Sequence, residues 1–112
     1  MSQKQKLWGP VSTIPVTASG TLDANKVVKE GNIYGVPVDA IASGDKGVLH
    51  VRGVFEQTKS VTAEVIAIGD FIEYVSAGIV RKHDQGVKIG KAYEASGGTT
   101  ATVLVELMPE LY

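Results

Sequence analysis

Hydrophobic and polar residues alternate along much of this chain, and a period of two predicts β-strands. Tyr34, Val36, Val38 and Ala40 fall on one face of a strand predicted over residues 34–40. The same alternation predicts further strands over residues 47–55, 70–75 and 101–107. Short strands separated by turns are therefore expected through most of the chain.

The second of these predicted strands has distinct inner and outer faces. Leu49, Val51 and Phe55 alternate toward the expected core, whereas His50 and Arg52 point outward. This pattern is typical of a strand that covers a core with one face and meets solvent with the other.

Three segments depart from the alternation. Pro15 has no backbone N–H to give to a sheet, so residues 13–17 are predicted as an edge strand or an arm. Residues 58–68 carry apolar side chains at helical spacings, but their many β-branched residues suit an extended loop as well. Residues 81–86 are predicted as a charged turn.

Two stretches of the sequence resemble each other. The first runs from Tyr34 to Val51 and the second from Ile89 to Leu104. Both have an apolar residue before glycine, then an acid followed by alanine, then Ser-Gly and a strand. Ile41 and Ala42 have no counterpart in the second stretch. Two similar hairpins in one barrel or sandwich are therefore predicted.

Together these patterns predict an all-β fold, a small barrel or sandwich of short antiparallel strands with an extended N-terminal arm. Residues 1–12 form the predicted arm, and residues 13–112 form a single β-rich domain. The length of 112 residues is enough for one domain. The 13 glycines, against only 4 prolines, agree with many tight turns.

Composition and charge exclude several classes of function. The chain has no cysteine, so disulfides, thiolate catalysis and zinc–thiolate sites are ruled out, and a cytosolic origin is compatible. A net charge of -1 and a pI of about 6.1 give no general attraction to nucleic acid. No apolar run approaches the roughly 18 residues that a membrane span needs. The N-terminus has no apolar core typical of a signal peptide.

The glycine-rich stretch Ser43-Gly-Asp-Lys-Gly47 has the composition of a phosphate-binding loop. Such a loop requires Gly-Lys-Ser/Thr at the start of a helix, whereas a strand is predicted to follow Gly47. The matching stretch Ser96-Gly-Gly-Thr has no lysine. We therefore predict a hairpin bend in which Gly44 and Gly47 adopt positive φ angles.

No other residues form a convincing chemical site. His50 and His83 are expected on the surface, because a metal site needs three or four converging ligands. Asp70 and Glu73 are three residues apart in a predicted strand and would face opposite sides. A Gly-x-Ser-x-Gly motif is absent from the sequence. No catalytic, cofactor-binding or metal-binding residue is predicted, and hence no enzyme and no cofactor.

The two ends of the chain carry the predicted interface residues. A basic and aromatic segment at the start is either a solvated tail or an anchor on a neighbouring subunit. The apolar and acidic end, Met108-Pro-Glu-Leu-Tyr112, either docks on a partner or closes the protein's own core. The predicted interface residues are Lys4, Lys6, Leu7, Trp8, Met108, Leu111 and Tyr112.

A series of short motifs follows in order between residues 31 and 107. They are Gly35-Val-Pro-Val-Asp-Ala, Gly47-Val-Leu-His-Val-Arg-Gly-Val-Phe-Glu, Ala67-Ile-Gly-Asp-Phe-Ile-Glu-Tyr, Ile89-Gly-Lys-Ala-Tyr-Glu-Ala-Ser-Gly and Thr102-Val-Leu-Val-Glu-Leu. In this order and spacing they resemble the small capsid cement, or decoration, proteins of tailed phages, a family long classed as a domain of unknown function. Residues 1–11 look longer and more basic than is usual for that family.

This resemblance implies a role as well as a fold. Such a protein would be made in the host cytoplasm, bind the outer surface of the phage head and stabilise contacts between major capsid subunits. It would act as a homo-oligomer, with a trimer favoured over a dimer, and would bind neither nucleic acid nor membrane directly. The family offers no catalytic residues to carry over.

Three other functions remain open at this point. The chain could be another virion structural component, in the head-completion or tail apparatus, which copy number per particle would distinguish. A nucleotide-binding enzyme would need a phosphate cradle that the sequence lacks. A carbohydrate-binding β domain would have only 4 tyrosines and 1 tryptophan for sugar platforms.

Overall fold

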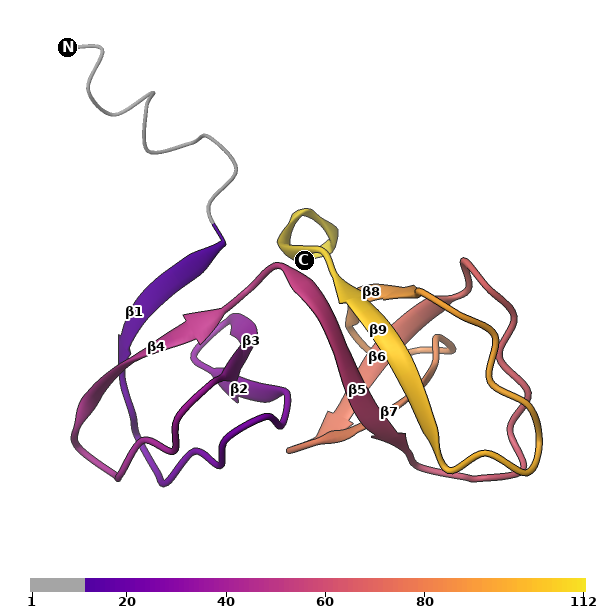
Figure 1. The fold of residues 1–112 in the computed structure, drawn as a ribbon. Coiled ribbons are helices and arrows are strands. Elements are labelled where there is room, and N and C mark those ends of the chain that lie inside the picture. The colour runs from indigo at the N-terminus through magenta and orange to yellow at the C-terminus, as the bar shows by residue number, and fades with distance from the viewer. Residues whose placement is uncertain (1–11) are drawn as a thin grey trace, which may run out of the picture.

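The computed structural model describes residues 12–112, and this part of the chain is all-β, which confirms the predicted fold class (Figure 1). A short 3-10 helix, η1 (Pro109–Leu111), follows the last strand. The strands are β1 (Thr13–Thr17), β2 (Val28–Glu30), β3 (Ile33–Pro37), β4 (Lys46–His50), β5 (Gly53–Lys59), β6 (Phe71–Ser76), β7 (Ile79–Lys82), β8 (Lys88–Ala92) and β9 (Thr102–Leu107).

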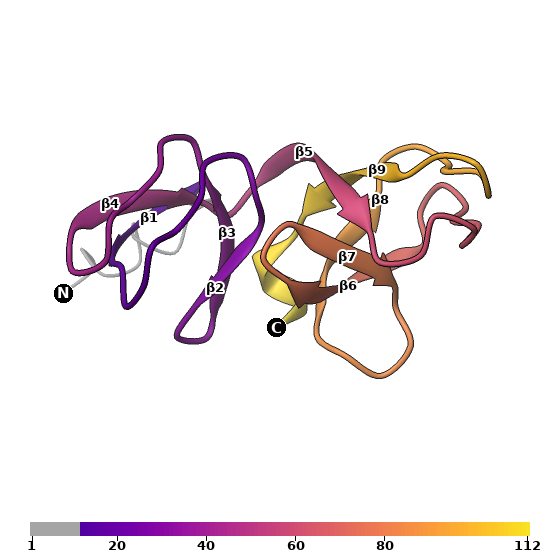
Figure 2. The same ribbon diagram turned by 90° about the horizontal axis from the view of Figure 1, so that it is seen from below.

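The strands form two sheets that lie side by side (Figures 1 and 2). The first is a four-stranded sheet in the order β1-β4-β3-β2, with every neighbouring pair antiparallel. The second is a closed barrel in the order β5-β7-β6-β8-β9. Its pairs are antiparallel except for β5 and β7, which run parallel where the barrel closes.

The chain passes from the sheet to the barrel at Gly53, where the sequence predicted one continuous strand over residues 47–55. That prediction is wrong, because β4 ends before this point and β5 begins at it. Gly53 has a φ of 124°, a conformation that residues with a side chain rarely adopt, and it redirects the backbone. Leu49 and Val51 are nevertheless buried, as the alternation predicted, and Phe55 is half-buried.

The two ambiguous segments are now defined. Residues 58–68 contain no helix: β5 occupies the first two, and the rest is a loop held by an isolated antiparallel bridge between Ile66 and Ser96. The charged turn predicted over residues 81–86 is shorter than expected, because Arg81 and Lys82 belong to β7.

The two similar stretches of sequence form two similar hairpins, β3–β4 and β8–β9, each of them antiparallel. Both have a long connection that makes one isolated bridge, at Ile41 in the first and at Ser96 in the second. The prediction of two related hairpins is confirmed, but they lie in different sheets rather than in one.

Each hairpin has a glycine at the equivalent position, Gly35 in the first and Gly90 in the second. This glycine allows the two strands of the hairpin to lie very close together. A Cβ atom on Gly35 would lie 2.9 Å from the His50 carbonyl oxygen, and one on Gly90 would lie 2.0 Å from the Glu106 carbonyl oxygen. Real side chains do not tolerate such contacts with backbone. The repeated glycine therefore reflects close packing rather than a turn.

The main hydrophobic core joins the two sheets. It contains Val27, Tyr34 and Val36 from the first sheet and its connections, packed with barrel residues that include Ile72 and Val105. A smaller cluster covers the opposite face of the four-stranded sheet, and its buried members are Ala18, Leu22, Val28, Ile41 and Leu49. The four-stranded sheet is thus covered by the barrel on one face and by its own loops on the other.

A buried amide reinforces this contact between sheet and barrel. The Gln57 side chain, only 3% exposed, lies on β5. Its Oε1 accepts a hydrogen bond of 2.8 Å from the Val27 N–H, and its Nε2 donates one of 3.1 Å to the Asn25 carbonyl. Apolar packing and these directional bonds together fix how the two sheets lie relative to each other.

We predict that Gly90→Ala destabilises the protein by about 3 kcal/mol or more, because the new methyl group overlaps the Glu106 carbonyl and neither strand can yield freely. Gly97→Ala is the matched control, since a Cβ there meets nothing within 4 Å. Urea unfolding of both variants measures the difference. Equal stability of the two would contradict the close crossing.

Candidate interaction surface

The structure describes only one of the two chain ends that carry predicted interface residues. Lys4, Lys6, Leu7 and Trp8 lie outside the described residues. At the other end, the chain folds back after β9 so that the Tyr112 side chain contacts β3. This position was one of the two alternatives that the sequence left open for the tail.

The Tyr112 hydroxyl completes the hydrogen bonding of one β3 residue. It donates a bond of 2.8 Å to the Tyr34 carbonyl and accepts one of 3.1 Å from the Tyr34 N–H. The two rings meet edge to face with their centroids 4.9 Å apart, and the Tyr74 ring lies 5.1 Å from Tyr34 on the barrel side. Burial raises the pKa of Tyr112 above its ordinary value. The last residue therefore connects the barrel end to the first sheet.

The residues before Tyr112 contact β8 and the link between β4 and β5. The Met108 N–H donates a bond of 2.9 Å to the Ile89 carbonyl, and Glu110 forms an ion pair of 3.2 Å with Arg52. Met108 and Leu111 are half-buried, and Tyr112 keeps 40% of its surface exposed. A contact of these three residues with another subunit stays a prediction.

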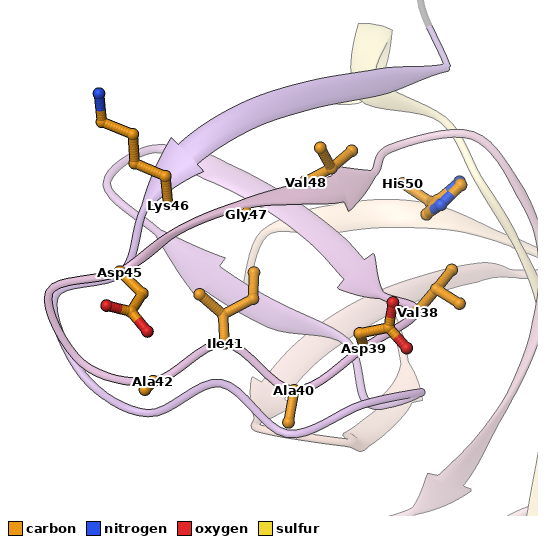
Figure 3. Close-up of a pocket in the computed structure, with 10 residues that line it drawn as sticks. All are labelled: Val38, Asp39, Ala40, Ile41, Ala42, Asp45, Lys46, Gly47, Val48 and His50. Carbon is orange, nitrogen blue, oxygen red and sulfur yellow. The ribbon is translucent and has the colours of Figure 1, made fainter.

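The bend at residues 43–47 borders a pocket of about 390 Å³ (Figure 3). The pocket lies between β4 and the connection that leaves β3. It is lined by Val38, Asp39, Ala40, Ile41, Ala42, Asp45, Lys46, Gly47, Val48 and His50.

The bend itself is a hairpin connection, as predicted, and its two glycines have different roles. Gly44 has a φ of 87°, which confirms the expected positive angle. The same expectation for Gly47 is wrong, because it lies within β4 and a Cβ there would be 2.3 Å from the Ile41 Cδ1 atom. Position 47 has room only for glycine, because the Ile41 side chain packs directly over it.

The chemistry of the pocket does not suit a phosphate. No helix follows the bend, and the carboxylates of Asp39 and Asp45 are among the lining groups. The Lys46 side chain extends away from the other lining side chains in Figure 3. The lining instead includes the exposed apolar side chains of Val38 and Val48.

The described residues contain no group of three or more His, Asp or Glu side chains that could hold a metal ion. His50 is half-buried at the pocket. His83 was expected on the surface, and this expectation is wrong for one of its ring nitrogens. Its Nδ1 atom is buried 3.2 Å from the Glu73 Oε1 atom and makes no hydrogen bond within residues 12–112.

Glu73 is a buried carboxylate that the sequence did not reveal, with 2% of its surface exposed. Burial alone would raise its pKa. Hydrogen bonds from the Asp84 N–H, the Arg81 guanidinium and the Gly86 N–H outweigh that effect and lower the pKa to about 2. The carboxylate therefore stays ionised and organises the bend after β7.

A buried ammonium group holds the far end of the barrel. Lys59 is 3% exposed, and its Nζ donates to the Glu64 carbonyl at 2.5 Å and to the Gly97 carbonyl at 2.9 Å. The two loops that it joins present exposed apolar side chains. These are Val61, Val65 and Ile68 on the first loop and Tyr93 near the start of the second.

No helix among residues 12–112 has the length and apolar character needed to cross a membrane.

Replacing Tyr112 by phenylalanine tests whether the tail stabilises the first sheet. We expect Tyr112→Phe to lower the free energy of unfolding by about 1–3 kcal/mol, because the Tyr34 N–H and carbonyl both lose their partner. Tyr93→Phe is the control, since that hydroxyl bonds to none of the described residues and its side chain is 52% exposed. A loss no larger than in the control would mean that water replaces the hydroxyl at little cost.

The Glu73 carboxylate predicts how stability depends on pH. Its pKa is lower in the folded protein than the ordinary value of 4.5, so its contribution to stability is full above pH 4.5 and is lost as the pH falls through about 2. At neutral pH this contribution is about 3 kcal/mol. Glu73→Gln should remove it and flatten the acid limb of the stability profile.

Denaturant unfolding between pH 2 and pH 7 makes this measurement, with the exposed Glu94→Gln as its control. A profile for Glu73→Gln that keeps the steep acid limb of the parent protein would show that another group causes it.

Comparison with known proteins adds to this geometry. Residues 8–107 match the family of phage cement proteins. Among solved structures, the chain is similar to the N base of the head fiber gp8.5 of bacteriophage phi29. The two share 14% sequence identity with a TM-score of 0.45, over 86% of this chain and 96% of that one. None of the curated proteins matches the sequence.

The family match covers most of the chain and includes all the motifs that carried the resemblance, which is thereby confirmed. It also includes both hairpins and the pocket between β3 and β4. The chain belongs to the phage cement protein family and is a structural component of the virion.

Proposed function

We propose that this protein binds the outer surface of the phage head and stabilises contacts between major capsid subunits. The observation that carries the proposal is the family match over residues 8–107. The architecture supports it, because a cement protein requires a rigid scaffold with exposed contact surface and needs no reaction centre.

The buried polar groups support a role without catalysis. Gln57, Lys59 and Glu73 each bond to backbone groups that hold loops or sheets together. Groups used in this way are committed to structure, and no cofactor is needed for the role. The protein is therefore proposed not to be an enzyme.

Exposed apolar side chains at the barrel end offer one contact surface. Ile68 is 70% exposed and Val65 is 66% exposed, on a loop that Lys59 and the Ile66–Ser96 bridge hold in place. Surfaces of this kind are often used for association. On a closed shell many copies bind at once, so each single contact can be modest.

The protein is proposed to act as a homo-oligomer, with a trimer favoured over a dimer, in contact with the major capsid protein. A trimer suits positions of three-fold symmetry on the shell, where one copy meets each neighbouring subunit. A position in the head-completion or tail apparatus is the second candidate. It would place a few copies at one vertex instead of many over the surface.

Co-sedimentation with expanded phage shells tests the proposal. The full chain should bind in many copies spread over the shell, and removal of residues 1–8 should weaken binding while circular dichroism keeps its β signature. Sedimentation of the free protein gives its oligomeric state. Failure of the full chain to bind expanded shells would refute the proposal, and a truncated chain that unfolds would place the arm in the core instead.

A further inference from the structure

Two neighbouring loops at the far end of the barrel form one exposed apolar surface. They are residues 60–70, between β5 and β6, and residues 93–101, between β8 and β9. The bridge between Ile66 and Ser96 joins the loops, and the Lys59 ammonium group donates a hydrogen bond to each of them. The barrel therefore holds this surface in a fixed position.

The bridge explains why apolar side chains point outward here. Side chains alternate between the two sides of paired segments, so burial of Ile66 and Ser96 turns their chain neighbours toward solvent. We call this outward side the barrel-end surface. It consists of six exposed residues, which are Val61, Val65, Ala67, Ile68, Tyr93 and Ala95.

The charge on these two loops is entirely negative, because neither contains a lysine or an arginine. Two of their carboxylates serve the fold. Glu64 accepts a hydrogen bond of 3.0 Å from the Lys82 N–H, and Asp70 accepts one of 2.9 Å from the Ala67 N–H. The third, Glu94, is exposed, and its carboxylate has no ion pair or hydrogen bond within residues 12–112. The barrel-end surface is thus apolar and borders one unpaired carboxylate.

The start of the same chain has the complementary chemistry. Lys4 and Lys6 precede Leu7 and Trp8, and the sequence has no acidic residue before Asp23. Opposite charges on two surfaces favour their association and fix how they meet. Tryptophan is among the residues that contribute most to binding at protein interfaces. Residues 4–8 therefore match the barrel-end surface in both polarity and charge.

This segment does not reach the barrel-end surface of its own chain. The Ser12 carbonyl accepts a hydrogen bond of 2.9 Å from the Val51 N–H, which holds Ser12 at the first sheet. A chain extends by at most about 3.6 Å per residue, so the Cα atom of Trp8 lies within about 14 Å of that of Ser12. The seven residues of β5 alone cover about 20 Å between the sheet and the loops. Figures 1 and 2 show β1 and these loops at opposite ends of the molecule.

We propose that residues 4–8 of one copy bind to the barrel-end surface of the next copy, with Leu7 and Trp8 on its apolar side chains and Lys6 beside Glu94. The contact is head to tail, because it joins two different surfaces. Such contacts close into a ring where the rotation between copies allows it, and a trimer is a ring of this kind. This inference rests on the proposed homo-oligomer and names the surfaces that build it.

Cysteine cross-linking tests the contact directly, because the chain has no cysteine of its own. Copies with Leu7→Cys are mixed with differently tagged copies with Ala95→Cys, and mild oxidation should link the two kinds of copy by a disulfide. In the control, Asn32→Cys at the exposed turn between β2 and β3 replaces Ala95→Cys. It should give at least about tenfold less linked product, since no contact raises its local concentration. Both mixtures are oxidised free in solution and on expanded shells.

Surface variants of the full chain test the same contact without cysteines. Val65→Asp should weaken self-association about tenfold or more, because a charged group replaces an apolar contact. Val75→Asp is the matched control, since this valine is 44% exposed and lies outside the barrel-end surface. It should change association by no more than about twofold. Sedimentation equilibrium measures association, and circular dichroism checks that each variant folds.

A charge exchange tests the ionic part of the contact. Glu94→Lys should weaken self-association about fivefold, because Lys6 then meets a like charge. Adding Lys6→Glu to the same chain should restore association, since the two charges are again opposite. A double variant no stronger than Glu94→Lys alone would overturn the pairing of Lys6 with Glu94.

The outcomes separate this contact from the proposed function. If the parent protein binds shells but Leu7→Cys and Ala95→Cys copies do not cross-link in solution or on shells, the inference is overturned and the proposed function stands. If Val65→Asp weakens shell binding while cross-linking is absent, the shell protein occupies the barrel-end surface instead, which also overturns the inference. Copies that cross-link but do not bind expanded shells would support the contact and refute the proposed function. Cross-linking decides where a surface variant fails to fold or the measurements disagree.

Discussion

The packing of the barrel against one face of the four-stranded sheet is the contact on which the rest of the structure depends. A sheet of four short strands with a small second cluster would be marginal alone, and the barrel supplies the apolar partner for its other face. Val27, Tyr34 and Val36 are buried only because the barrel covers them. Gln57 and Tyr112 then add directional bonds at two points of that contact.

This arrangement divides the molecule into fixed and open parts. The barrel-facing half of the sheet is covered, whereas the half formed by β1 and β4 has its outer residues exposed. The pocket lies in the open half, next to strands whose positions the core determines. Side chains on rigid strands lose little conformational entropy when a partner covers them, so contacts of modest area can suffice.

Sequence alone predicted the local features of the fold well. Burial of Leu49 and Val51 follows from the two-residue period. The repeated motif located both hairpins, because Gly35 and Gly90 are each required where the backbone of the paired strand lies too close for a side chain. The change of sheet at Gly53 was not predictable, since it depends on which distant strands pair. The burial of Glu73 was not predicted, because a register shift beside it buries two consecutive residues, against the alternation. The pocket was not predictable either, because it lies between β4 and a long connection whose path no local pattern records.

The parallel contact of β5 with β7 has a consequence for the protein before assembly. It closes the barrel, so none of its five strands presents an unpaired edge to a neighbouring molecule. Under the proposed function many copies would gather on one surface, where unpaired sheet edges favour sheet-to-sheet aggregation. Closure removes that risk from the larger half of the fold and confines strand-mediated contacts to the four-stranded sheet.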